Sequence, residues 1–231
     1  MNETEDLKFK GNDPGAVRFG NFINYYSFYP PHERTERLPK NIWRTEGISY
    51  CLDIGCNTGD LTKALSNFLL NCGSNNEIIG IDIDPTLISR AKEHHETNLK
   101  FFCVDIMNCD GYNSIKTFLN DLNLKKFHIV TCFSISMWIH LNHGDIGLRI
   151  FLKRVSDLSE LLVIEAQPWR CYRNAVKRMK KCNSTFSLFP YLQYRENIVK
   201  DIENILTEEC QRIKITETED TKWGRKTLFF R

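Results

Sequence analysis

Several common functional signatures are missing from this 231-residue chain. Its nine cysteines form no C-x-x-C pair, which argues against a zinc site and a disulfide framework and favours a reducing compartment. No apolar run reaches the roughly 18 residues that a membrane-spanning helix needs, and residues 1–13 are polar and acidic rather than a signal peptide. We therefore expect a cytoplasmic protein, with the nucleus as the alternative, and neither a metal nor a membrane partner.

An excess of charge of one sign is also missing. The net charge is only +2, so any basic surface must be local, and the 42% of hydrophobic residues indicate a folded chain. This length suits one large α/β domain and is short for two. We expect residues 19–231 to form that domain, residues 1–18 to be a loose arm, and the protein to be a monomer.

A glycine-containing stretch at residues 50–60, YCLDIGCNTGD, organises the rest of the chain. The stretch contains Asp53, Gly55 and Gly59. In residues 61–65, which follow it, the apolar side chains are at helical spacing. The pattern predicts a buried strand, a tight turn and a helix start, as at the opening of a doubly wound sheet. The spacing D-x-G-x-x-x-G is not the G-x-G-x-x-G of dinucleotide sites, which disfavours a phosphate cradle. It is similar to the first motif of class I methyltransferases, which bind S-adenosylmethionine (AdoMet).

Acidic side chains stand at the ends of the next two predicted strands. Asp82 lies where a doubly wound fold places the acid that binds a ribose diol. Asp84 is interpreted instead as the cap of the following helix. Asp105 and Ile106 end the third strand, where an acid and an apolar neighbour can hold an adenine ring, although such a pair is also an ordinary strand end.

Apolar periodicity predicts the remaining elements. The last two predicted strands flank a turn at residues 220–224, which indicates an antiparallel hairpin that completes a seven-stranded, mostly parallel sheet. The predicted strands are 49–54, 77–83, 99–104, 127–133, 160–165, 212–217 and 226–230, and the predicted helices are 60–70, 84–95, 110–123, 144–157 and 197–209.

Aromatic residues are concentrated before the first strand. Residues 19–29 contain six aromatic side chains in eleven residues, too many for a solvated linker. We expect residues 19–38 to pack over the domain. The same segment can be a lid on a ligand or a stacking platform for a base, and these interpretations are compatible.

Two histidines follow the fourth predicted strand, with an aromatic neighbour. His140 and His143 are spaced i and i+3 beside Trp138, and Asp145 is a nearby acid. Metal binding needs a third ligand at suitable spacing and is disfavoured. A structural role and substrate contact remain as alternatives. No N-P-P-Y motif follows this strand, which counts against methylation of a base amino group.

Positive charge is concentrated after the fifth predicted strand. A basic helix face is often only solvated, but this run begins at a strand carboxyl end, where such sheets bind ligands, so we favour phosphate contact. Its members are Arg170, Arg173, Lys177, Arg178, Lys180 and Lys181.

With these pieces placed, the chain resembles the Bicoid-interacting-protein-3 family of RNA 5′-phosphate methyltransferases from about Phe19 to the final LFFR. FGNFINYYSFYPP, LDIGCNTGDL, IDIDP, MWIHLNHGD and EAQPWRCY occur in family order. The branch that methylates the 5′-monophosphate of histidine tRNA and some microRNA precursors fits best. The larger branch, which caps a γ-phosphate, typically has tryptophan where this chain has His143. Ala166 departs from the usual E-P-Q-P-W.

The resemblance implies a single class I AdoMet-dependent methyltransferase domain with a Rossmann-like sheet. It also implies that Arg34 meets the methionine carboxylate of AdoMet. The cofactor contacts that it carries over, together with the strand-end residues above, are Tyr26, Arg34, Asp53, Gly55, Asn57, Gly59, Asp82, Ile83, Asp105, Ile106 and Phe133.

The implied reaction is methyl transfer to the terminal phosphate of a small RNA. It needs positioning rather than an assigned catalytic residue. The candidate phosphate ligands are His140, His143, Arg170 and Arg173. The alternatives are γ-phosphate capping, methylation of a protein or small molecule, and RNA binding without catalysis.

Overall fold

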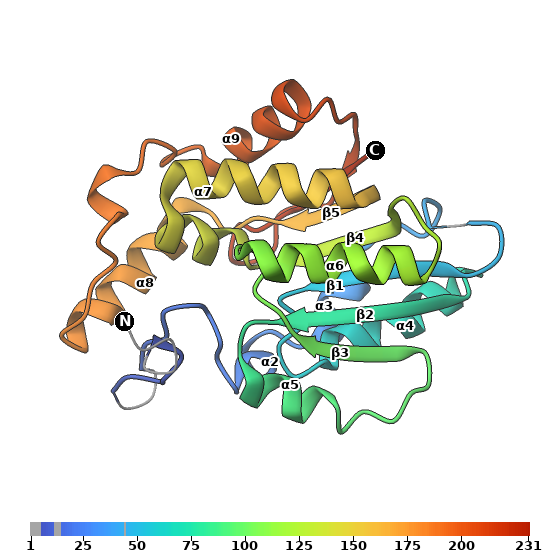
Figure 1. Cartoon of the computed structure of the whole chain (residues 1–231). Helices are drawn as coiled ribbons and strands as arrows, with labels where there is room; N and C mark the ends of the chain where they lie inside the picture. Colours follow the sequence, from blue (N-terminus) through green and yellow to red (C-terminus); the bar gives the residue numbers. More distant parts are fainter. Residues whose placement is uncertain (1–5, 12–14, 44) are drawn as a thin grey trace.

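One sheet runs through the residues that this computed structural model describes, 6–11, 15–43 and 45–231 (Figure 1). Its order is β3-β2-β1-β4-β5-β7-β6. Strands β1 to β5 are parallel, and β7 is antiparallel to both β5 and β6. This confirms the predicted seven-stranded class I sheet with its antiparallel hairpin. The strands are β1 (Ser49–Ile54), β2 (Asn76–Asp82), β3 (Leu99–Cys103), β4 (Phe127–Phe133), β5 (Ser159–Glu165), β6 (Lys214–Glu217) and β7 (Thr227–Phe230).

Helices cover both faces of the sheet. In Figure 1, α6, α7 and α9 lie on one face, and α3, α4 and α5 lie on the other. No helix among the described residues is long and apolar enough to cross a bilayer. The helices are α2 (Tyr25–Phe28), α3 (Pro31–Thr35), α4 (Asp60–Asn71), α5 (Pro85–Ala91), α6 (Cys109–Asp121), α7 (Ser136–Leu158), α8 (Trp169–Lys181), η1 (Phe189–Tyr191), α9 (Ile198–Asn204) and η2 (Ile205–Glu209).

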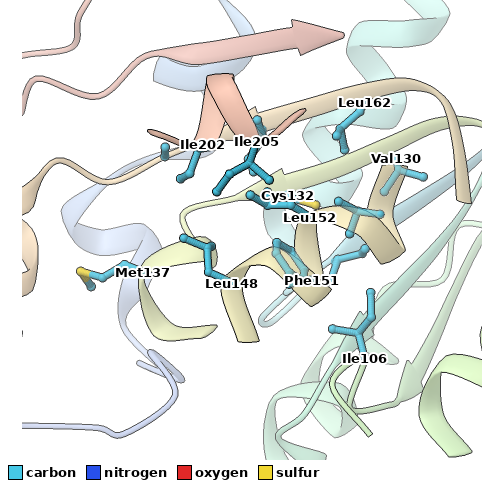
Figure 2. Packing of buried hydrophobic residues seen from close by; sticks show 14 of the residues in the cluster. Ile106, Val130, Cys132, Met137, Leu148, Phe151, Leu152, Leu162, Ile202 and Ile205 are labelled. Carbon is cyan, nitrogen blue, oxygen red and sulfur yellow. The ribbon is translucent and has the colours of Figure 1, made fainter. Parts of the chain in front are cut away.

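The central strands are apolar on both faces because helices cover both. Along β5, Leu161 and Val163 belong to the cluster on the α4 side, whereas Leu162 and Ile164 belong to the cluster on the α7 side. A parallel sheet covered on both faces requires such continuous apolar strands. Figure 2 shows the α7 side, where β4 and β5 contribute Val130, Cys132 and Leu162, and α7 contributes Leu148, Phe151 and Leu152.

Helix α7 begins earlier than the sequence predicts. The expected start was Gly144, but the helix runs from Ser136 to Leu158, and Gly144 is a non-helical kink with φ of 68°. Met137 and Leu141, spaced i and i+4, are buried in the same core as later residues of the helix. This apolar stripe places the histidine segment on a helix.

The described parts of the N-terminal arm contact the domain. Ala16 and Val17 are each only 2% exposed. Lys10 and Ala16 exchange two backbone hydrogen bonds of 2.8 Å, and Arg18 forms an ion pair with Asp6. Residues 1–5 and 12–14 of the predicted loose arm lie outside the described residues, and residues 15–17 depart from that prediction because they are buried.

Candidate active site

Asp82 ends β2 at the edge of the sheet where all the parallel strands terminate. Its carboxylate accepts backbone N–H bonds of 3.0 Å from Asn57 and from Asp84. Burial raises the pKa of Asp82 to about 6, against the lowering effect of these two donors. Each oxygen has a further lone pair that a ribose hydroxyl can use.

A hollow of about 70 Å³ lies beside Asp82. Gly55 forms part of its wall with φ of 78°, and a Cβ added there would come within 2.9 Å of Ile135. Only glycine therefore leaves this wall open beside the carboxylate. The hollow is lined by Phe19, Ile54, Gly55, Ile81, Asp82, Ile83, Val104, Asp105, Ile106, Ile135, Trp138, Ile139 and His143. The structure thus brings five predicted cofactor contacts together, with the mixture of acids and apolar walls that suits a nucleoside.

Asp53 lies beneath the glycine turn and holds it to its neighbours. The hydroxyls of Thr62 and Thr131 each donate a 2.6 Å hydrogen bond to its carboxylate. Burial raises the pKa of Asp53, and these two donors partly oppose the rise. Asp53 therefore joins β1 to α4 and β4, and its carboxylate is occupied within the protein.

The other predicted contacts near the turn connect it to the aromatic segment. The hydroxyl of Tyr26 donates to the Cys56 carbonyl at 3.3 Å. Asn57 donates from Nδ2 to the Phe22 carbonyl at 3.1 Å. Gly59 immediately precedes α4. These bonds bring residues 22–26 over the turn.

Two arginines and one glutamate form a buried cluster at the ends of β4 and β5. Arg34 is 3% exposed and donates to the Glu165 carboxylate at 3.3 and 3.1 Å. Arg34 also donates to Tyr25 at 2.6 Å and to Ser134 at 2.8 Å. Arg225 approaches from the other side, donating to Tyr25 and Ser134 at 3.1 Å each. Phe133 is the buried residue that ends β4 beneath the Arg34 guanidinium, 5.7 Å away.

This cluster carries excess positive charge because two guanidinium groups share one carboxylate. Burial opposes ionisation of Glu165, but Arg34 and then Arg225 outweigh it and hold the pKa of Glu165 below its ordinary value. The buried Nε of Arg225 has no hydrogen-bond partner within the described residues. An unpartnered buried donor beside excess positive charge suits an anionic ligand.

A cleft of about 1130 Å³ adjoins the hollow, and Trp138 lines both. Its cationic lining residues come from the N-terminal arm, from α8 and from the loop between β6 and β7: Lys8, Arg170, Arg178, Lys222 and Arg225. Asp84 also lines the cleft, but its carboxylate accepts bonds from Asn21 at 2.7 Å and from the Thr86 N–H at 2.8 Å. The cleft therefore presents mainly positive charge to a ligand.

The aromatic segment contributes to the lining of this cleft. Phe22, Tyr25 and Phe28 line it. The Phe22 ring lies 6.1 Å from Trp138. Gly20 has φ of 79°, and a Cβ there would fall 2.1 Å from the Trp138 indole nitrogen. The segment is thus seated directly on the residue that separates the hollow from the cleft.

The structure separates the four residues predicted to hold the phosphate. Arg170 lines the cleft, whereas Arg173 lines a different groove on α8. His143 lines the hollow beside the strand ends. His140 is fully buried, with Nε2 2.7 Å from Asp145 and Nδ1 3.2 Å from the Tyr172 hydroxyl. We therefore carry only Arg170 forward as a phosphate ligand, and the arrangement of His140 matches the structural alternative.

Comparison with known proteins agrees with this geometry. Residues 52–158 match a family model described as a methyltransferase domain, and residues 127–231 match Bicoid-interacting protein 3 (Bin3). The pre-miRNA 5′-monophosphate methyltransferase of Danio rerio is 36% identical, over 96% of this chain and 95% of its own length. The chain belongs to the Bin3 family. The human (Homo sapiens) RNA 5′-monophosphate methyltransferase is 37% identical over 94% of this chain and 82% of its own.

Solved structures show that the Bin3-family chain has the class I methyltransferase fold. The N-methyltransferase NodS of Bradyrhizobium japonicum, in complex with S-adenosylhomocysteine, matches with a TM-score of 0.59 at 14% identity. That match covers 93% of this chain and 94% of NodS. The plantazolicin methyltransferase BpumL matches with a TM-score of 0.56 at 14% identity, over 90% of this chain and 87% of its own.

Sequence reasoning missed the contribution of the C-terminal loop in this Bin3-family protein. Lys222, Trp223 and Arg225 line the cleft, whereas the sequence pattern predicts only a turn at residues 220–224. The signal was present in the predicted hairpin. Because β7 is antiparallel to β5, its first residue, Thr227, pairs with Glu165 at the ligand-binding edge, and the loop before β7 must reach the same place.

Proposed function

We propose that this protein is an AdoMet-dependent enzyme that methylates the 5′-monophosphate of a small RNA. The observation that carries the proposal is the position of the cation-lined cleft directly beside the strand-end hollow, with Trp138 shared by both. Methyl transfer to an anion requires a nucleoside-type cofactor site and an anion site in contact. Bin3-family relatives named for an RNA 5′-monophosphate substrate support this choice of anion.

The residues of the hollow fit AdoMet. Asp82 would accept hydrogen bonds from the ribose, and Ile83, Asp105 and Ile106 would surround the adenine. The Gly55 turn leaves space beside them. Bound there, AdoMet supplies a methyl group attached to a positively charged sulfur. Arg34 stays a predicted partner of its carboxylate, from a position where it is already paired with Glu165.

The cleft cations would hold the phosphate for methylation. A terminal phosphate has a second pKa of about 6, so it is already largely anionic at neutral pH and needs no general base. Arg170 and Arg225 offer planar guanidinium groups that can each bind two phosphate oxygens. Their task is to fix the phosphate while one oxygen stays exposed to the methyl group, and positioning of this kind can supply most of the rate enhancement. The product phosphate carries one negative charge fewer.

The test is transfer of labelled methyl from AdoMet to one small RNA prepared with a 5′-monophosphate, a 5′-triphosphate or a 5′-hydroxyl. We expect label on the monophosphate form alone. Label on the triphosphate would indicate γ-phosphate capping, and equal label on the hydroxyl form would indicate an internal site; either result contradicts the proposal. Bound AdoMet with no transfer to any of the three RNAs would favour a binding role.

The variant Arg225→Lys tests the cleft in the same assay. It keeps one positive charge but loses the guanidinium fork, so we expect kcat/KM for the monophosphate RNA to fall about 10- to 100-fold. Arg149→Lys is the matched control, because Arg149 is exposed and pairs with Glu209 away from the cleft lining. Equal activity of the two variants, both folded by thermal melting, would remove Arg225 from the phosphate site.

A further inference from the structure

Helix α8 carries cations on two separate edges. One edge lines the cleft with Arg170, Asn174 and Arg178, spaced by four residues. A second edge lines a different groove and holds the exposed cations Arg173, Lys177, Lys180 and Lys181. The buried residues Tyr172, Ala175, Val176 and Met179 anchor the helix between these edges. The proposed phosphate site uses only the first edge.

The second edge lines an open groove, which we call the outer groove, of about 490 Å³. Its walls are Arg173, Val176, Lys177, Lys180, Lys181 and Phe189, with no acidic residue among them. Across the described residues, none of these four cations takes part in an ion pair. By contrast, Lys63, Lys153, Lys200, Lys214 and Lys226 are each paired with an acid. In a chain with a net charge of only +2, this row of uncompensated cations is a local positive field.

The far wall of the outer groove is held in place by the rest of the fold. Phe189 stacks on Trp169, at the start of α8, with ring centroids 5.2 Å apart and planes 10° apart. Asp145 accepts the backbone N–H groups of Gln193 at 2.9 Å and of Tyr194 at 3.3 Å. The groove is therefore preformed, which lowers the ordering cost of binding.

We propose that the outer groove binds the sugar-phosphate backbone of the RNA body while the cleft holds its 5′ end. This inference rests on the proposed function for the identity of the ligand. At 1.5 Å per residue, Arg170 and Lys181 stand about 16 Å apart along α8, which is several nucleotide steps at about 3.4 Å per step. Lysines attract phosphates as point charges and read no sequence. The groove would thus select RNAs that continue beyond the terminal nucleotide.

The test uses the full chain and two 5′-monophosphate substrates, a hairpin RNA and a trinucleotide. For Lys177→Ala/Lys180→Ala/Lys181→Ala we expect KM for the hairpin to rise about 10-fold or more at moderate salt, with kcat unchanged. The slope of log KM against log salt should fall by about two to three. KM for the trinucleotide should stay the same, because it does not reach the groove.

The matched control is Lys125→Ala/Lys126→Ala. Both lysines are exposed and immediately precede β4, at the opposite end of the parallel strands from the cleft. Their removal lowers the positive charge without touching either edge of α8. We expect the control to leave KM for the hairpin unchanged.

Three results would overturn the inference. They are an unchanged hairpin KM and salt slope in the triple variant, an equal rise in KM for both substrates, and an equal rise in the control. Failure of the proposed function gives a different result, in which the wild-type protein methylates neither substrate. In that case, filter binding of the hairpin tests whether the outer groove binds RNA. Salt-dependent retention that is lost in the triple variant supports RNA binding in the groove, and unchanged retention refutes it.

Discussion

At the scale of single residues, two opposing effects set the pKa of the Asp82 carboxyl group. Burial raises it and backbone hydrogen bonds lower it, and the resulting pKa is about 6. A carboxyl group with a raised pKa is protonated below that value and then loses the charge that strengthens a bond from a ribose hydroxyl. We expect the dissociation constant of AdoMet to increase as the pH falls through about 6. Calorimetric titrations between about pH 5 and 8 would measure this.

The variant Asp82→Asn is the companion experiment. It cannot ionise, so its affinity for AdoMet should not change with pH in this range. Its amide would also face one of two backbone N–H donors, from Asn57 or Asp84, and we expect binding about 10-fold weaker. A wild-type affinity that does not vary between pH 5 and 8 would show that another group receives the ribose.

The hydrogen-bond partners of His140 determine its protonation state. The Asp145 carboxylate only accepts hydrogen bonds, so Nε2 of His140 carries a proton, and the Tyr172 hydroxyl donates to Nδ1. Burial lowers the pKa of His140, against the raising effect of Asp145. Neutral His140 satisfies both contacts. Because the pKa of His140 is lower in the folded protein than in the unfolded chain, the stability that His140 contributes is lost as the pH falls below about 6.5.

We expect His140→Ala to lower the free energy of unfolding by about 3 kcal/mol, because it leaves a cavity and removes the hydrogen bond from His140 to Asp145. Urea unfolding at neutral pH measures this, and exposed His143→Ala is the control. If His140→Ala kept its stability and raised only the KM for RNA, His140 would return as a phosphate ligand.

At the scale of elements, the aromatic segment and α7 meet where Gly20 lies against Trp138. Any side chain at Gly20 must displace the indole or the segment. We expect Gly20→Ala to weaken AdoMet binding about 10-fold and to lower stability by about 2 kcal/mol or more. Thermal melting and AdoMet titration would measure both effects.

Gly47→Ala is a matched control for this prediction. Gly47 has φ of 76°, close to the 79° of Gly20, but a Cβ there would meet nothing within 4 Å. It therefore reports the backbone strain alone, about 1 kcal/mol. Equal losses in the two variants would show that contact with Trp138 does not matter.

Elements were predictable where local pattern and fold rules agree. Apolar strands covered on both faces, glycine at the first turn and acids at the strand ends identified Gly55, Asp82 and Asp105. The start of α7 was missed because Gly144 resembled a helix boundary, whereas the buried stripe from Met137 continues through it. The glycine suggested that the helix begins there, whereas packing against the core extends α7 toward the N-terminus.

At the scale of the whole molecule, the pairing of polar and charged groups far apart in the chain could not be predicted from the sequence. Arg34 and Glu165 are 131 positions apart, and Tyr25 and Arg225 are 200 apart. Nothing local to Arg34 shows that its guanidinium is already shared. The seven strands and the terminal hairpin were accessible from apolar patterns along the chain, but side-chain partners across the sheet edge depend on the completed fold.

Ligand binding should stabilise the whole fold, because the hollow is assembled from the ends of several strands. We expect S-adenosylhomocysteine at about 100 times its dissociation constant to add about 2.7 kcal/mol to the free energy of unfolding. Urea titrations with and without the ligand would measure the gain. No gain for a chain that is folded at the start would contradict the proposed cofactor site.

The strand order has a consequence for the protein as it is being made. Every residue of the hollow lies between Phe19 and His143, so the chain has emerged far enough to enclose a nucleoside well before the cleft exists. Strand β6 pairs only with β7 among the described strands, although β7 is translated later. Arg225 comes just before β7. A nascent chain would therefore complete the residues of the proposed cofactor hollow first, and those of the proposed RNA cleft last.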